Sequence, residues 1–68
     1  MEREPVTSSN AVSIGYDATT ETLEVEFKNG VYQYYNVPQS IYEQMMIEGS
    51  IGKFLNVYVK PMYPCAKV

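Results

Sequence analysis

Residues 22–35 read TLEVEFKNGVYQYY, two β-prone runs separated by an Asn-Gly dipeptide. In the first run apolar and charged residues alternate strictly, which is typical of a strand that buries one face. Asn29-Gly30 is a strong signal for a two-residue type I′ hairpin turn. The second run is rich in tyrosine and favours a strand. This stretch therefore predicts a β-hairpin.

The turn also sets the expected register of the hairpin. The expected pairs are Lys28 with Val31, Phe27 with Tyr32, Glu26 with Gln33, Val25 with Tyr34, and Glu24 with Tyr35. Directly opposed residues of an antiparallel pair lie on the same face. Tyr32 and Tyr34 are therefore expected on the core face, whereas Tyr35 points outward.

The preceding residues add a third strand. Residues 12–16 again alternate apolar with small residues, and a turn at 18–21 folds them back onto the central run. The expected pairs are Asp17 with Thr22, Tyr16 with Leu23, Ile14 with Val25, and Val12 with Phe27. Both hairpins then place their apolar residues on one side of the sheet, and a slip of one residue would expose the whole set.

The residues that follow the sheet change to helical spacing. Pro38 favours the first position of a helix that runs to Glu48, and Gly49 is expected to end it in a left-handed conformation. Ser50 can cap a second helix. The apolar stripe of that helix is Ile51, Phe54, Leu55 and Tyr58, and its exposed face carries Lys53, Asn56 and Lys60.

The predicted fold class is α+β, a three-stranded antiparallel β-meander followed by two short α-helices packed on one face (βββαα). An apolar sheet face and two apolar helix stripes bury one another when the helices cover the sheet. Residues 1–11 are expected to be a flexible N-terminal arm, and residues 12–65 a single domain. The expected core is Ile14, Leu23, Val25, Phe27, Tyr34, Ile41, Met45, Phe54 and Leu55.

The amino-acid composition excludes several classes of catalytic and metal-binding site. The chain has 68 residues, a net charge of −3, no histidine and one cysteine. Without histidine, a Ser-His-Asp arrangement and a His-containing metal site are impossible, and one cysteine excludes a Cys₄ zinc site. We therefore expect no enzyme, no cofactor and no metal. The charged start has no apolar stretch behind it and the cysteine has no partner, so neither a signal nor a membrane span is expected, and the location is expected to be cytoplasmic.

A series of short motifs resembles one known family. The motifs include Ser8-Ser9-Asn10, Gly15-Tyr16-Asp17, Tyr32-Gln33-Tyr34, Val37-Pro38, Gly52-Lys53-Phe54, Asn56 and Tyr63-Pro64. This ordered series resembles the KTSC domain, a small module at the C-terminus of some lysyl-tRNA synthetases that also occurs as stand-alone bacterial and phage proteins. The resemblance implies RNA binding and no catalytic residues.

The candidate binding residues are Tyr35, Ser50, Lys53, Asn56, Lys60 and Tyr63. Residues 49–68 contain three lysines and no acid, a charge asymmetry that can mark a phosphate-binding face. Three functions stay open. Composition slightly favours a module that binds another protein, such as a phage or mobile-element accessory acting on a host protein. The resemblance favours RNA binding. The third is a structural domain that self-associates as a homodimer.

Overall fold

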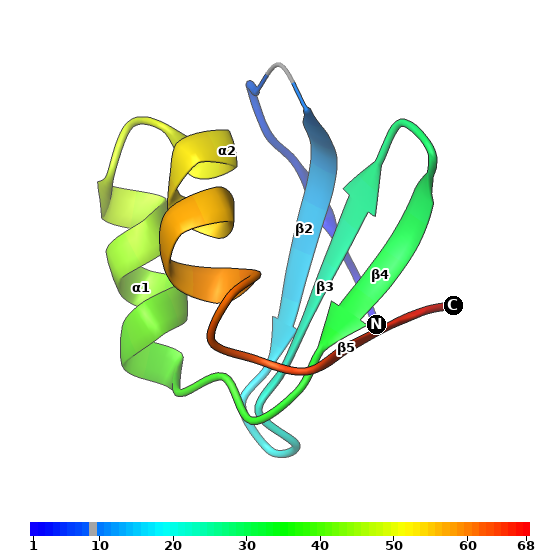
Figure 1. The fold of residues 1–68 in the computed structure, drawn as a ribbon, viewed down its shortest axis with the longest axis vertical. Coiled ribbons are helices and arrows are strands. Elements are labelled where there is room, and N and C mark those ends of the chain that lie inside the picture. The colour runs from blue at the N-terminus through cyan, green and yellow to red at the C-terminus, as the bar shows by residue number, and fades with distance from the viewer. Residues whose placement is uncertain (9) are drawn as a thin grey trace.

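The computed structural model describes residues 1–8 and 10–68 and shows a five-stranded antiparallel sheet with its helices on one face (Figure 1). Ser9, part of the Ser8-Ser9-Asn10 motif, lies outside the described residues. The strands lie side by side in sequence order. The elements are β1 (Glu4–Pro5), β2 (Ala11–Asp17), β3 (Thr22–Phe27), β4 (Gly30–Tyr34), α1 (Gln39–Ile47), α2 (Ile51–Phe54), the π-helix η1 (Leu55–Val59) and β5 (Cys65–Lys67).

The α+β class and the two helical segments are confirmed, but the sheet has five strands rather than three. The two additional strands lie at the sheet edges. β1 has two residues and lies within the segment 1–11 predicted to be an arm, and β5 has three residues near the C-terminus. Strands this short show no recognisable alternation, so the sequence pattern does not predict them.

The register of the β3–β4 hairpin differs from the predicted one by two residues. Lys28 and Asn29 form the loop, so Phe27 pairs with Gly30 and Val25 with Tyr32. Gly30 has a φ of 143°, whereas Asn29 is not among the residues with positive φ, which a type I′ turn would require. A shift of two residues preserves the side-chain faces. Tyr32 and Tyr34 therefore lie on the core face as predicted, although their predicted strand partners are wrong.

The β2–β3 hairpin confirms the pairs of Asp17 with Thr22, Tyr16 with Leu23, and Ile14 with Val25. The expected pair of Val12 with Phe27 is wrong. An irregularity between Ala11 and Ser13 sets Ala11 opposite Phe27 and leaves Val12 exposed. A bulge inserts one unpaired residue and so changes the face from that point on.

The first helix begins one residue later and ends differently from the prediction. Pro38 is its N-cap, not its first helical residue. Glu48 ends the helix in an extended conformation while its N–H still bonds the Gln44 carbonyl. The chain therefore leaves the helix without the left-handed residue expected at Gly49, whose φ is not positive.

The second helical segment starts after Ser50, as predicted, but the Ser50 side chain makes no capping hydrogen bond. The segment then widens into a π-helix, in which the Lys60 N–H bonds the Leu55 carbonyl. The wider turn places Val59 in the core and leaves Tyr58 56% exposed. The expected apolar stripe through Tyr58 is therefore wrong at its last position.

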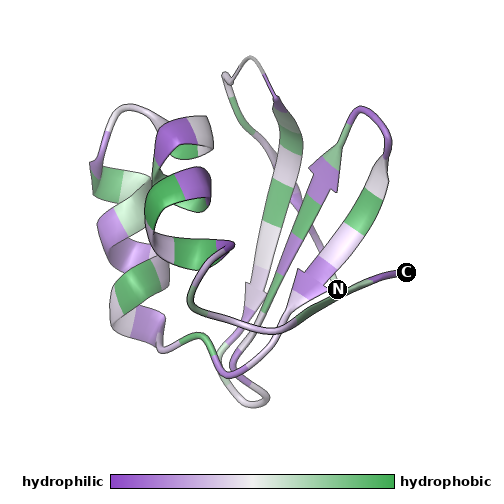
Figure 2. Ribbon diagram, in the orientation of Figure 1, coloured by the Kyte–Doolittle hydropathy of each residue, from purple (hydrophilic) through white to green (hydrophobic). Residues whose placement is uncertain are grey.

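The core lies between the sheet and the helices, and Figure 2 shows apolar residues alternating with polar ones along the strands. Seven of the nine expected core residues are buried, and the other two, Phe27 and Ile41, are half-buried and pack against that core. The prediction missed Ala11, Val37 and Val59. Each of these depends on a local irregularity or a loop that periodicity does not describe.

Candidate binding groove

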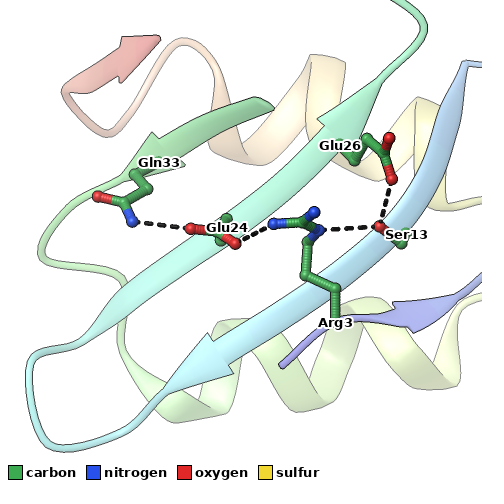
Figure 3. A network of polar contacts seen from close by, with 5 residues as sticks. All are labelled: Arg3, Ser13, Glu24, Glu26 and Gln33. Atoms are coloured by element: carbon green, nitrogen blue, oxygen red, sulfur yellow. Dashed lines mark hydrogen bonds and ion pairs between the residues drawn. The ribbon is translucent and has the colours of Figure 1, made fainter. Parts of the chain in front are cut away.

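The outer face of the sheet, away from the helices, carries a continuous chain of polar contacts (Figure 3). Arg3 forms an ion pair with Glu24 and donates a hydrogen bond from Nε to the Ser13 hydroxyl at 3.0 Å. The Ser13 hydroxyl in turn donates to Glu26 at 2.9 Å, and the Gln33 amide donates to Glu24 at 2.8 Å. The carboxylates of this face are therefore partnered within the fold.

Glu24 is the centre of this network. Glu24 lies on the outer face of the sheet, yet it is only 6% exposed. The hydrogen bond from Gln33 is the main cause that lowers its pKa, and Arg3 adds to it against the opposing effect of burial. A buried carboxylate needs such partners to stay charged. Glu24 therefore holds the N-terminal segment on the sheet.

The N-terminal segment also covers part of this face directly. A Cβ added at Gly15 would clash with the carbonyl oxygen of Glu2 and lie 3.1 Å from the Arg3 side chain. Only a glycine lets the two backbones approach so closely. The outer face therefore carries partnered acids and is covered in part by the N-terminal segment, and a hollow of about 560 Å³ beside it is lined by Met1, Asp17 and Gln33 among others.

A groove of about 640 Å³ opens on the other side of the sheet, at the β3–β4 turn. Its lining residues come from the loop before β2, from the β3–β4 hairpin, from η1 and the residue after it, and from β5. They are Asn10, Phe27, Lys28, Asn29, Tyr32, Tyr34, Asn56, Lys60 and Cys65. Among the described residues, none that lines this groove is acidic. We call it the aromatic–lysine groove.

Aromatic rings form one wall of the aromatic–lysine groove. Phe27 and Tyr32 are both half-buried, and their ring centroids lie 5.6 Å apart at an interplanar angle of 67°. Lys60 crosses from the helical side, and its Nζ lies 4.9 Å from the centroid of the Phe27 ring. An ammonium at this distance is attracted by the ring face. The deepest tyrosine, Tyr34, is buried, and burial raises its pKa.

Two further lysines lie around this end of the hairpin. Lys28 belongs to the turn and lines the groove itself. Lys67 pairs with Tyr32 across the β4–β5 ladder and so lies on the same face. Its side chain passes over Gly30, where an added Cβ would lie 2.6 Å from the Lys67 Cε. Lys28 and Lys60 therefore line the groove, and Lys67 lies at its edge beside the turn of the hairpin.

The structure brings only two of the predicted site residues into the aromatic–lysine groove, Asn56 and Lys60. Ser50 and Lys53 line a second hollow of about 530 Å³ at the start of α2, which Asn56 also borders. Tyr35 is half-buried, and its hydroxyl donates to Gln33 at 3.1 Å. The predicted opposition of Tyr35 to Glu24 is wrong, because Gln33 occupies that position.

The last predicted site residue, Tyr63, is half-buried and packs against the core. Conversely, the sequence prediction assigned Phe27 and Tyr32 to the interior and so missed them as groove residues. The available signal was their position beside the turn, at the end of the hairpin. The two short helices cover less of that end than of the middle of the sheet, where Leu23 and Val25 are fully buried.

The described residues contain no group of three or more His, Cys, Asp or Glu side chains that could hold a metal ion. Within the same residues, no helix is long and apolar enough to cross a membrane. The residues that line the groove offer a ligand ammonium groups, aromatic rings, tyrosine hydroxyls, the Cys65 thiol and the amides of Asn10, Asn29 and Asn56.

Comparisons with known proteins place this geometry in a family. A crystal structure of a KTSC domain protein from Yersinia pestis matches with a TM-score of 0.95 and 38% identity, over 98% of this chain and 96% of that one. A protein from Tsukamurella paurometabola is 36% identical over 61 residues, 88% of this chain and 91% of its own length. A lysine–tRNA ligase from Trichormus variabilis is 37% identical over 46 residues, 66% of this chain but only 8% of the ligase. The KTSC domain family itself matches residues 7–63, and the chain belongs to that family.

Proposed function

We propose that this KTSC domain is a non-catalytic module that binds single-stranded nucleic acid, with RNA as its ligand, in the aromatic–lysine groove. The observation that carries the proposal is the lining of the groove, where lysines meet half-buried aromatic rings and none of the described lining residues is acidic. Single strands are held by cations along the phosphates and by aromatic faces under the bases. The similarity to a segment of a lysine–tRNA ligase supports RNA as the class.

The net charge of −3 does not oppose this proposal, because the charges are separated in space. Glu24 and Glu26 lie in the network on the outer face of the sheet, with Arg3 and Ser13 as partners. The lysines of the groove lie on the opposite face. A phosphate in the groove therefore meets local positive charge, although the whole molecule is acidic.

The test is fluorescence anisotropy of a labelled single-stranded RNA, measured against the wild type at several salt concentrations. Each phosphate contact on a single strand contributes about −0.7 to the slope of log K against log salt. Lys60→Met should weaken binding and flatten the slope by about 0.7. Lys53→Met is the matched control, because Lys53 does not line the groove. Equal effects of the two substitutions, or no binding at low salt, would refute the proposal.

A second candidate, binding of another protein, is favoured by a different observation. Four apolar side chains of the helical layer are exposed: Met46, Ile47, Val57 and Tyr58. Ile47 is 82% exposed. Exposed apolar clusters often mark interaction sites. A pulldown with nuclease-treated samples that captures a stoichiometric protein, and loses it with Ile47→Asp, would support this function. Concentration-dependent sedimentation of the purified chain would indicate self-association instead.

A further inference from the structure

The half-buried Phe27 ring forms part of the wall of the aromatic–lysine groove, and a cation of the protein itself, the Lys60 ammonium, lies over it. We infer that Phe27 is a stacking platform for one unpaired base, and that Lys60 leaves the ring and binds the phosphate of the same strand when the base arrives. This inference rests on the proposed function and specifies how the groove holds its ligand.

The geometry around the ring supports an exchange of partners. Tyr32 meets Phe27 at a steep angle, 67°, and so supports the ring without lying parallel to it as a stacked partner would. Lys60 lies over the ring with its Nζ 4.9 Å from the centroid. An exposed ammonium on a Phe ring is held weakly, whereas a base stacked on an aromatic side chain is held more strongly. Replacement of the ammonium by a base is therefore favourable.

Lys60 is well placed to move to a phosphate. It is the residue directly after η1, is exposed, and carries four flexible carbons before its charge. Asn56, four residues earlier, lines the same groove and has an amide that can both donate and accept hydrogen bonds. The π-helix sets both residues toward the groove while Val59 faces the core. Wide helical turns of this kind are rare and are often found at functional sites.

The same arrangement favours a nucleotide over an acidic peptide. Either ligand could contact the ammonium groups of Lys28, Lys60 and Lys67. Only a ligand with a flat ring gains from the exposed face of Phe27. The Phe27 ring should therefore strengthen the binding of a nucleotide but not that of an acidic peptide. The experiment tests this difference.

The experiment is an NMR titration of the full chain carrying ¹³C-labelled phenylalanine and lysine. The chain has two phenylalanines, and Phe54 is only 5% exposed, so it serves as an internal control. The probes are a short single-stranded adenylate RNA, an abasic sugar–phosphate chain of the same length, and a polyglutamate peptide.

In the free protein, the Lys60 ε-methylene signal should be shifted upfield by the Phe27 ring current. The RNA should shift the Phe27 signals, leave those of Phe54 in place and return the Lys60 signal toward its ordinary position. The abasic chain should bind at least about fivefold more weakly than the RNA. Phe27→Leu, which keeps an apolar side chain but removes the ring, should reduce RNA binding to the level of the abasic chain.

Two failures are distinguishable. If RNA binds in a salt-sensitive way but the abasic chain binds equally well, or the Lys60 signal does not move, the stacking inference is wrong and the proposed function survives. If polyglutamate binds as tightly as RNA, the groove does not select nucleic acid and both are wrong. If no nucleic acid binds at low salt, the proposed function itself is wrong. The dispersed Phe54 signals report in every variant whether the core remains folded.

Discussion

The π-helix η1 contains two valines, two residues apart, that differ in burial. Val59 is fully buried, whereas Val57 is 49% exposed. Val→Ala at either position removes the same two methyl groups. In a regular α-helix with Tyr58 on the inward stripe, the two valines would flank that stripe symmetrically. Because both substitutions remove the same atoms, a difference between their effects on stability tests the wider turn.

The expected cost differs strongly between the two sites. At Val59, two buried carbons contribute about 1.6 kcal/mol of transfer free energy at ~0.8 kcal/mol each. A residual cavity on the order of 40 Å³ adds about 1 kcal/mol at ~24 cal/mol per Å³. Val59→Ala should therefore lower the free energy of unfolding by roughly 2.5 kcal/mol. Val57→Ala should cost less than about 0.5 kcal/mol, as surface substitutions do.

Urea unfolding followed by circular dichroism measures both values. With a denaturant slope near 1 kcal/mol per M for so small a domain, Val59→Ala should lower the midpoint by about 2.5 M. Val57→Ala should leave the midpoint almost unchanged. Equal losses at the two valines, or a larger loss at Val57, would refute the placement of Val59 in the core and with it the wider turn.

Three further predictions concern the sheet. Because the pKa of Glu24 is lowered in the folded protein, its charge stabilises the fold above the ordinary glutamate pKa, and this contribution is lost as pH falls through the folded value. The urea midpoint of wild type should therefore fall more steeply on acidification than that of Glu24→Gln, and parallel curves would contradict this. Gly15→Ala should lower the unfolding free energy of the full chain, because the added Cβ clashes with the Glu2 carbonyl oxygen. The loss should be smaller when residues 1–5 are deleted. An equal loss in the two chains would contradict the placement of the N-terminal segment over Gly15. Gly30→Ala should lower the unfolding free energy by more than about 1 kcal/mol, because its φ is 143° and Lys67 lies against it, whereas Gly49→Ala, with open space around it, should be nearly neutral.

The sequence predicted the side-chain faces of most strand residues, but it predicted strand partners correctly only in the β2–β3 hairpin as far as Ile14. The alternation of Leu23, Val25 and Phe27 correctly indicates the core face, because parity survives a shift of two residues. The actual loop depends on which backbone angles Asn29 and Gly30 adopt, and the bulge near Val12 depends on the neighbouring strand. Both are local backbone choices that period-two patterns do not encode.

The candidate site was harder to predict, since it assembles from segments that are distant in sequence. Asn56 and Lys60 were recognised as one exposed helical face, and the structure places both in the groove. Phe27 was assigned to the core because it alternates with charged residues, as a buried residue would. Its partial exposure depends on where the helices stop covering the hairpin, a property of the packed layers.

Mapping of backbone amide shifts on addition of single-stranded RNA tests most directly whether nucleic acid occupies the aromatic–lysine groove. Occupancy of the groove should concentrate the shifts at the β3–β4 turn, at residues 56–60 and at the C-terminal strand β5. Shifts centred on the Arg3–Glu24 network or on the exposed Ile47 and Val57, or no shifts at low salt, would contradict it.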